Sequence, residues 1–501
     1  MRTRIAETWV VGYENNRHIL HRGFQVVYEE DRIIYVGPRF NGHLDETIEA
    51  PDRLVAPGFI DTHVHSGYRA LHKLLSDVGR SDLYGQPYMD VSVPRQGTKI
   101  QGYPNYVTAA EAAEEKTLEL HALFTVGELL RNGVTTFVEL GSQVAVQEAL
   151  WRQCERLGVR GYLGPGYDSG RWVGVEGGRL ERIVDEQEGL RLFEEAIAFI
   201  KRTQEHGGGL ISGLLVPREV ENCSVDLLRR TVLTARELRV PMATHAAYSV
   251  IEFYETVRQY RMTPIELLDS VDMLCPELNI GHGNLIADNP RMNYSGARDL
   301  ELMGSHRVSV SHCPINIVRR ARTLDSWEKY SKAGVNLTIG SDTYPRDMMM
   351  NMRTASYHGK VMSHNLKAAS AADVYTAATL NGARSLGRDD LGRLVPGAKA
   401  DVIIIDLTGR GTLRYGAIRD PIRSIIECGI GDDVETVIVN GIVRMRDRRI
   451  LELDLDEVRR AAQSTADHLW SHVQDWDPLF RTADDMSPLS FCPDSQHGRH
   501  G

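Results

Sequence analysis

The sequence predicts an α/β protein: a (β/α)8 TIM barrel with a small β-sandwich formed from both ends of the chain. Two observations predict the barrel. Eight short apolar stretches recur along the middle of the chain, and amphipathic helical patterns separate most of them. A third observation predicts the sandwich, because alternating strand patterns in residues 1–50 return near the other end. A chain of 501 residues is long enough for one large domain and an accessory module.

The eight predicted barrel strands are apolar runs that mostly end in polar or turn-forming residues. They are residues 54–65, 135–140, 161–167, 210–217, 240–246, 278–283, 307–313 and 335–342. An open, doubly wound sheet is the alternative architecture. The sequence has no GxGxxG turn that would indicate nucleotide binding by such a sheet, so the barrel is favoured.

The strand patterns also set the expected domain boundaries. The stretch 23–37 alternates apolar pairs with charged turns, and the stretches 395–407 and 432–447 have the same pattern. We therefore expect four units, which are the first part of the sandwich, the barrel, the second part of the sandwich, and a C-terminal helix with a polar tail. These units are residues 1–53, 54–389, 390–450 and 451–501.

Composition narrows the class of partner. The net charge of −10 disfavours nucleic acid and anionic membranes, because both attract concentrated Lys and Arg. The six cysteines show no CxxC spacing, which argues against a disulfide framework or a zinc ribbon. No export signal and no uncharged run of about 18 apolar residues is visible. We expect a cytoplasmic protein that binds a small molecule and no nucleic acid or membrane.

Histidines and an aspartate stand at the ends of the predicted strands. His63 and His65 are two residues apart on the first strand, so both rings point to one face. His245, His282 and Asp342 end strands five, six and eight. A barrel carries its active site at the carboxyl ends of its strands, so these five side chains are expected to converge on a metal ion.

Imidazole and carboxylate ligands suit a borderline divalent ion such as Zn²⁺ or Fe²⁺. Three nitrogens and one oxygen leave a position for water, and the bound ion would lower the pKa of that water to about 7. Asp342 could then take the proton of the water and pass it to a leaving group. His282, which is not needed as a ligand, could orient the water or polarise the bond under attack.

Five motifs carry a family resemblance. PGFIDTHVH, MATHAAY, GHGNL, SHCPIN and GSD resemble those of the amidohydrolase superfamily, and the similarity extends into the predicted sandwich. The most similar branch is that of the one-metal cytosine deaminases and chlorotriazine hydrolases. The resemblance implies that His63, His65, His245 and Asp342 bind the metal and that His282 lies beside the water. Two-metal branches carry a lysine on strand four, which LISGLLVP lacks, so one ion is expected, Zn above Fe, Mn or Co.

The sequence departs from that branch at one position. The family usually has a glutamate three residues after the strand-five histidine, where it protonates the ring nitrogen of the substrate. Here Tyr248 stands at that position. A carbonyl substrate needs no such acid, so the departure favours hydrolysis of an amide, urea or carbamate of a small aromatic molecule, as in the phenylurea-type hydrolases. An aminohydrolase or dechlorinase of a nitrogen heterocycle is the alternative, and a catalytically inactive assembly subunit is a third hypothesis.

Four other acids could replace the missing glutamate, although each is more typical of a surface charge or a structural partner. They are Glu139, Glu219, Glu221 and Glu252. Tyr248 itself could donate a hydrogen bond to an oxyanion or simply line the pocket.

Further substrate contacts are expected from the long loop 66–106, which carries Tyr84 and Tyr88, and from His312 at the end of strand seven. Aromatic loops of this kind also form oligomer contacts. The helical pattern from residue 451 could cover a neighbouring subunit, and we expect a homo-oligomer.

Overall fold

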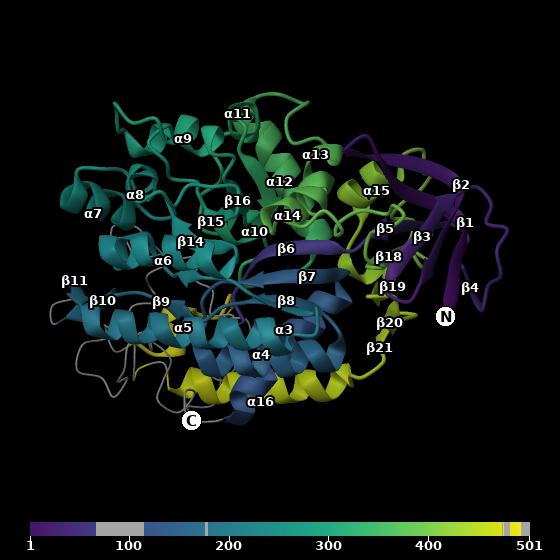
Figure 1. Ribbon diagram of the computed structural model, residues 1–501, viewed down its shortest axis with the longest axis horizontal. Coiled ribbons are helices and arrows are strands. Elements are labelled where there is room, and N and C mark those ends of the chain that lie inside the picture. The colour runs from purple at the N-terminus through teal and green to yellow at the C-terminus, as the bar shows by residue number, and fades with distance from the viewer. Residues whose placement is uncertain (67–114, 176–178, 473, 475–480, 492–501) are drawn as a thin grey trace, which may run out of the picture.

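The structure is a computed structural model that describes residues 1–66, 115–175, 179–472, 474 and 481–491. A mixed sheet lies at one end of the molecule, and parallel strands with surrounding helices make up the rest (Figure 1). Among the described helices, none combines the length and the apolar character that crossing a membrane requires.

Eight strands form two parallel four-stranded sheets, in the orders β12-β8-β7-β6 and β14-β15-β16-β17. The eight apolar runs of the sequence correspond to these strands in chain order, and all but β7 are shorter than predicted. Their bounds are β6 Phe59–Val64, β7 Val134–Glu139, β8 Arg160–Leu163, β12 Ile211–Gly213, β14 Met242–Ala246, β15 Leu278–His282, β16 Ser309–His312 and β17 Asn336–Ile339.

Isolated parallel bridges connect the two sheets at both edges. Val64 pairs with Asp342 beyond the end of β17, and Leu215 pairs with Met242 of β14. At the first edge, the amide of Asp342 donates to the carbonyl of His63 and the amide of His65 donates to the carbonyl of Asp342, both at 2.8 Å. The arrangement is TIM-barrel-like, and it places the first strand beside the last.

The mixed sheet has nine strands drawn from both ends of the chain, in the order β21-β20-β19-β18-β5-β1-β2-β3, with β4 beside β1. The two ends of the chain therefore associate as expected. They form one continuous nine-stranded sheet, however, where the sequence predicted a β-sandwich. The bounds are β1 Arg2–Glu14, β2 Arg17–Glu29, β3 Arg32–Gly37, β4 Glu46–Glu49, β5 Arg53–Pro57, β18 Val402–Asp406, β19 Val434–Val439, β20 Ile442–Arg446 and β21 Arg449–Ile450.

One predicted strand, 54–65, is two strands in the structure. Its first half is β5 in the nine-stranded sheet, and its second half is β6 in the parallel sheet. The chain passes between them at Gly58, where a Cβ atom would lie 2.1 Å from Oγ1 of Thr135. Only glycine permits this close approach to Thr135, and apolar periodicity does not reveal the break at this residue.

Helices follow the strands at most connections. The longer ones are α3 Glu115–Arg131, α4 Val144–Leu157, α5 Glu186–His206, α6 Val225–Leu238, α7 Val250–Tyr260, α12 Met348–Ser363, α15 Pro421–Cys428 and α16 Leu455–Ser471. Shorter ones are η3 Val220–Asn222, α8 Pro264–Ser270, η4 Pro290–Met292, α9 Asp299–Ser305, α10 Pro314–Val318, α11 Trp327–Ala333, α13 Ala371–Ala377, α14 Leu380–Ser385, η5 Gly431–Asp433 and α18 Ala483–Met486.

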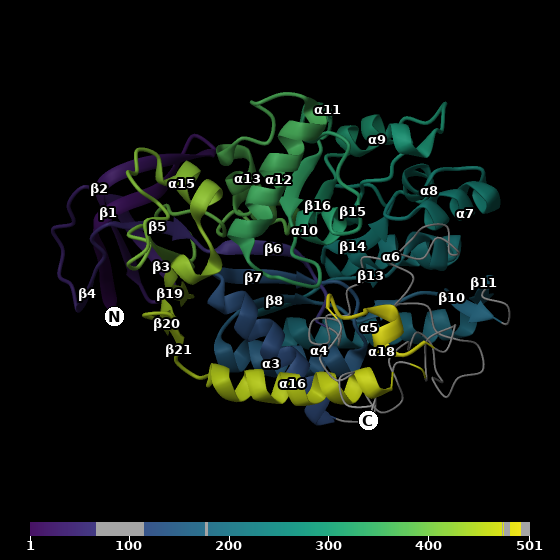
Figure 2. The same cartoon turned by 180° about the vertical axis from the view of Figure 1, so that it is seen from behind.

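Four short strands lie at the carboxyl edge of the parallel sheets. The pair β9 Gly166–Tyr167 and β13 Val216–Pro217 is parallel, and the pair β10 Gly170–Val175 and β11 Arg179–Val184 is an antiparallel hairpin. The C-terminal helix α16 packs along α3 of its own chain (Figure 2). The predicted homo-oligomer therefore gains no support from this helix and stays a prediction.

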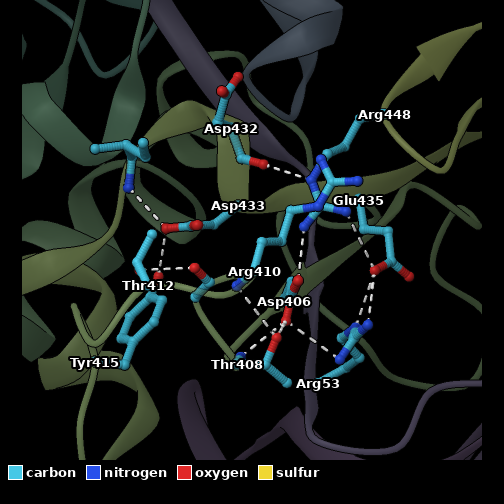
Figure 3. Close-up of polar contacts among 12 residues, drawn as sticks. Arg53, Asp406, Thr408, Arg410, Thr412, Tyr415, Asp432, Asp433, Glu435 and Arg448 are labelled. Carbon is cyan, nitrogen blue, oxygen red and sulfur yellow. Dashed lines mark hydrogen bonds and ion pairs between the residues drawn. The ribbon is translucent and has the colours of Figure 1, made fainter.

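An ion-pair network holds the two chain ends together. Arg53 on β5 and Arg448 before β21 both contact Asp406 of β18 and Glu435 of β19 (Figure 3). The Arg448 and Asp406 side chains are 7% and 2% exposed and lie 2.7 Å apart. Because burial removes both charges from water, each depends on the other for its solvation.

We expect Arg448→Ala to lower the free energy of unfolding by about 3 kcal/mol, since it leaves a buried carboxylate with only Arg53 as its cationic partner in this network. Arg446→Ala is the matched control. It removes an ion pair to Glu46 whose side chains are 47% and 31% exposed, and should cost less than about 1 kcal/mol. Urea denaturation of both variants measures the difference, and equal losses would contradict the importance of the network.

Candidate metal centre and active site

The histidines at the carboxyl end of β6, His63 within the strand and His65 directly after it, direct their rings to one point. His63 is fully buried, His65 is 24% exposed, and their Nε2 atoms lie 3.2 Å apart. The strand has this geometry because residues i and i+2 share a face. The prediction that the two rings converge is confirmed.

His245, the penultimate residue of β14, completes a group of three imidazoles. Its Nε2 lies 3.1 Å from Nε2 of His65. Its Nδ1 lies 2.8 Å from the carbonyl oxygen of Arg218, which can only accept a hydrogen bond. The proton is therefore assigned to Nδ1, so the lone pair of Nε2 is directed at the other two rings.

Asp342 and His282 lie beside these three rings. Nε2 of His282 is 3.6 Å from Oδ2 of Asp342, and Nε2 of His65 is 3.9 Å from Oδ1. Both residues have a left-handed backbone, with φ of +72° and +64°. Non-glycine residues adopt this conformation at an energetic cost, and such strain concentrates at functional sites.

Two glycines leave room for the buried ring of His63. A Cβ atom at Gly281 of β15 would lie 2.5 Å from Cε1 of His63, and one at Gly340, after β17, would lie 2.5 Å from Cβ of His63. Neither glycine has a positive φ. Their role is therefore close packing, which fixes the ring against two neighbouring strands.

The electrostatic environment prepares these groups for a cation. Burial lowers the pKa of His63 to about 3 and that of His282 well below its ordinary value, so both rings are neutral at neutral pH. Burial opposes ionisation of Asp342, yet the neighbouring His65 and His63 hold the pKa of its carboxyl below the usual range. Neutral imidazole and ionised carboxylate are the forms that bind a metal.

The donor set fits one divalent ion. In a tetrahedral zinc site the ligand atoms lie about 3.3 Å from one another, given Zn–N distances of about 2.0–2.1 Å. The spacings of 3.1 and 3.2 Å between the imidazole nitrogens agree with this value. Ligand atoms of His63, His65 and Asp342 lie within 4.8 Å of one another, and so do those of His63, His245 and His282.

The structure also adds neighbours that sequence reasoning missed. Cys313 lies within 4.8 Å of His282 and Asp342, and burial raises the pKa of its thiol well above the usual range. The amide of Asn316 donates a hydrogen bond to Oδ2 of Asp342. Both residues belong to the SHCPIN motif, in which the sequence analysis considered only His312 as a site residue. The sequence signal that could have identified Cys313 and Asn316 was their position at or just after the end of predicted strand seven.

The predicted substrate contacts have different outcomes. Tyr248 lies beside the cluster, with its ring 5.8 Å from that of His245 and 6.3 Å from that of His282. Among the described residues, His312 belongs to none of the groups that could hold a metal ion. Its ring packs against that of Trp327, with the ring centroids 6.1 Å apart. Its role as a substrate contact stays a prediction. Tyr84 and Tyr88 lie outside the described residues.

The four candidate replacement acids have distinct partners. Glu139 accepts hydrogen bonds from Ser66, Ser142 and Gln147, and Glu252 accepts from the amides of Ala247, Tyr248 and Ser249. These two are committed to structural contacts. Glu219 is partly exposed and lies near Asn222. Glu221 is buried and accepts a hydrogen bond from the hydroxyl of Tyr248 at 2.7 Å.

Comparison with known proteins identifies the family. Residues 54–443 match the model of the amidohydrolase family. The chain belongs to this family. It is therefore an enzyme, a hydrolase acting on carbon–nitrogen bonds, and the resemblance of the five motifs is confirmed.

Relatives of this amidohydrolase include the 5-methylthioadenosine/S-adenosylhomocysteine deaminase of Pyrococcus abyssi. It is 27% identical over 438 residues, which are 86% of this chain and 92% of that protein. An adenosine deaminase from Xanthomonas campestris with bound zinc has a TM-score of 0.76 and 20% identity, over 93% of this chain and 98% of that chain.

A second solved structure has the same fold. A variant of the atrazine chlorohydrolase from Arthrobacter aurescens TC1, complexed with zinc and atraton, gives a TM-score of 0.75 at 18% identity. The alignment covers 93% of this chain and all of that chain.

We expect Gly281→Ala to displace the His63 ring and to lower both metal content and turnover, the latter by about 100-fold, because small misplacements in a reactive site have effects of that size. Elemental analysis and kinetics measure the two effects. Gly127→Ala on α3 is the control, since its added Cβ meets only the end of the Leu453 side chain, at 2.8 Å. Full metal occupancy in Gly281→Ala would contradict the packing argument.

Proposed function

We propose that this amidohydrolase is a one-metal aminohydrolase, which replaces the amino group of a nitrogen heterocycle by oxygen and releases ammonia. The observation that carries the proposal is the convergence of His63, His65, His245 and Asp342. The relative from Pyrococcus abyssi is named for deamination of 5-methylthioadenosine and S-adenosylhomocysteine. Adenine nucleosides are therefore the first substrate class to test.

This proposal corrects the preference that the sequence suggested. The sequence favoured hydrolysis of an amide, urea or carbamate, because Tyr248 replaces the family glutamate. The named relatives instead favour ring deamination, which was the alternative. An inactive assembly subunit is disfavoured by the family and by the complete ligand set.

His63, His65, His245 and Asp342 would hold the ion, with zinc favoured over iron, manganese or cobalt. A bound ion of this kind supplies a strongly activated water at neutral pH. Neutral His63 presents its ring to the ion without a competing proton, and packing against Gly281 and Gly340 prevents it from turning away. The contact of His245 Nδ1 with the carbonyl of Arg218 leaves Nε2 of His245 facing the other rings.

Two residues would move or hold protons. Asp342 takes a proton from the attacking water and delivers it to the departing nitrogen, and the amide of Asn316 holds the carboxylate in place for both tasks. His282 is buried and neutral, with Nε2 3.6 Å from Asp342, so it can orient the water or bind the oxygen that forms.

Two proposals about the fold accompany the function. We infer that the two parallel sheets form one (β/α)8 barrel, since bridges join them at both edges. The barrel lies within the expected range 54–389 but begins at β6, because residues 54–57 belong to β5 of the nine-stranded sheet. We infer that residues 1–53 and 390–450 form the accessory β-module, since the nine-stranded sheet draws its strands from those two ranges, with β5 continuing to Pro57.

Carbonyl hydrolysis is kept as a second candidate, because Ala246, Ala247 and Tyr248 follow His245 and no glutamate stands at the family position. The products separate the two reactions. Purified protein should release ammonia from adenine nucleosides or other amino-substituted heterocycles, with about one equivalent of metal. Release of an aryl or alkyl amine from ureas, anilides or carbamates, without ammonia from any ring, would favour the second candidate instead.

We expect His63→Ala and Asp342→Ala to lose turnover by at least about 10³-fold, because each removes a ligand of the ion that activates water. Metal content should fall below one equivalent while the circular-dichroism spectrum keeps the wild-type shape. Chelator treatment of the wild type should have the same effect, with recovery when Zn²⁺ is returned. Full activity in either variant would contradict the assigned ligand set.

A further inference from the structure

Tyr248 and Glu221 form a buried hydrogen-bonded pair beside the candidate metal centre. The Tyr248 hydroxyl donates to Oε1 of Glu221 at 2.7 Å, and the two residues are 7% and 1% exposed. Tyr248 comes three residues after His245, and its ring contacts those of His245 and His282. Glu221 reaches it from η3, which follows strand four of the parallel set. The pair therefore connects the site to a carboxyl group that is remote in sequence.

The second oxygen of Glu221 favours a protonated carboxyl. Oε2 is buried and has no hydrogen-bond partner among the described residues. With a buried oxygen that has no partner, an ionised carboxylate costs more free energy than the neutral carboxylic acid. Burial, reinforced by the neighbouring Glu219, raises the pKa of Glu221 to about 7. Glu221 therefore holds a proton in a large fraction of molecules near neutral pH.

Several other charges surround Glu221. Those that interact with it are Asp168 after β9, Arg182 on β11, Glu219 before η3, Cys223 after η3 and Glu252 on α7. On the other elements that pack against η3, Arg171 of β10 interacts with Asp168, Glu266 of α8 caps its own helix, and Asp269 of α8 pairs with His306. The acidic groups outnumber the cations that act on Glu221, which favours its protonated form.

A second buried acid positions the tyrosine. Glu252 accepts hydrogen bonds from the amides of Ala247 and Tyr248, at 2.7 and 2.9 Å, and closes the capping box of α7 with Ser249. Ala247 has a φ of +51°, so the chain turns sharply between His245 and Tyr248. Glu252 stabilises this turn and is not available to a substrate. Of the two buried acids, it is Glu221 that reaches the hydroxyl.

We propose that Tyr248 and Glu221 together take the place of the missing family glutamate, with Tyr248 donating a proton to the ring nitrogen of the substrate and Glu221 replacing it. The inference rests on the proposed ring deamination. It names Tyr248 as a catalytic residue and Glu221 as the positioning and proton-supplying residue behind it.

The proton balance of this step closes. Water attacks the carbon that bears the amino group, a C–O bond forms, and the C=N electron pair moves to the ring nitrogen, which takes the Tyr248 proton. For this transfer the protonated oxygen of Glu221 donates to the Tyr248 oxygen, the reverse of the hydrogen bond that ionised Glu221 accepts, and the Tyr248 O–H then points to the ring nitrogen. Tyr248 recovers a proton from Glu221, and Asp342 takes one from the water. Asp342 then protonates the amino group, the C–N bond breaks, and ammonia leaves. The hydroxyl proton left on the new C=O oxygen returns to Glu221 through solvent.

The relay is specific to a ring substrate. An amide or urea carbonyl has no ring nitrogen that must be protonated before attack, so its hydrolysis does not require a proton from Glu221. Loss of Glu221 should therefore affect the two reaction types unequally.

The test compares Glu221→Gln and Tyr248→Phe with the wild type, on the best heterocycle found by ammonia release. In the wild type, kcat/KM should fall as the pH rises through about 7, because Glu221 acts in its protonated form. Glu221→Gln keeps the size of the side chain but has no acidic proton. It should lower kcat/KM by about 10²–10⁴-fold and abolish that limb of the pH profile, with metal content unchanged. Tyr248→Phe should show a similar loss.

Tyr415→Phe is the matched control. Its hydroxyl donates to Asp433 at 2.6 Å in a second buried tyrosine–carboxylate pair, with residues 8% and 2% exposed, in the nine-stranded-sheet region (Figure 3). The Tyr415→Phe variant loses the same kind of hydrogen bond and should keep the wild-type kcat/KM and pH profile. Thermal unfolding of all three variants shows whether any loss arises from the fold.

The outcomes separate the two proposals. Ammonia release by the wild type, with a loss and an altered pH profile confined to Glu221→Gln and Tyr248→Phe, supports the relay. Wild-type kcat/KM and pH profile in Glu221→Gln would overturn the relay and leave ring deamination intact. If the wild type releases no ammonia from any heterocycle and cleaves carbonyl substrates instead, ring deamination is overturned, and the relay with it.

Discussion

The active site depends on two backbone hydrogen bonds between the first and last strands of the parallel set. The amide of Asp342 donates to His63, and the amide of His65 donates to Asp342. Because these bonds belong to the backbone, they fix the relative positions of the main-chain segments that carry the two histidines and the aspartate. His245 is held separately, by hydrogen bonds of its backbone amide and its Nδ1 with the carbonyl of Arg218. The candidate ligands are therefore close together before an ion binds, which reduces the ordering cost of binding.

Buried polar contacts of the residues just before His63 stabilise this pairing of the first and last strands. The hydroxyl of Thr62 bonds those of Ser311 and Thr338 at 2.7 Å, and the amide of Asn279 donates to the carbonyl of Thr62. Asp61 accepts hydrogen bonds from the amides of His63 and Ser341. A polar interior is stable only when its groups are satisfied, so this network restricts how the strands can shift against each other. That restriction keeps the ligands in place.

Tyr248 stands at the position where related deaminases usually carry a glutamate. Tyr248 is longer than glutamate and carries a weakly acidic hydroxyl. Its position next to Glu221 gives that hydroxyl a buried carboxyl partner, so acidity and reach are divided between two side chains. The same position is compatible with hydrogen bonding to a carbonyl oxygen.

The sequence by itself determined the parallel strands and the four expected ligands, because strand periodicity and motif spacing are local properties that place His63, His65, His245 and Asp342 at strand ends. It also placed the two chain ends in one β-module. Only the tertiary structure decided that the strand 54–65 divides at Gly58, and that Glu221, among four candidate acids, contacts Tyr248. Those results depend on which atoms meet across distant segments, here Gly58 against Thr135 and η3 against the end of β14. The periodicity within a segment gives no information about its contacts with segments that are distant in the sequence.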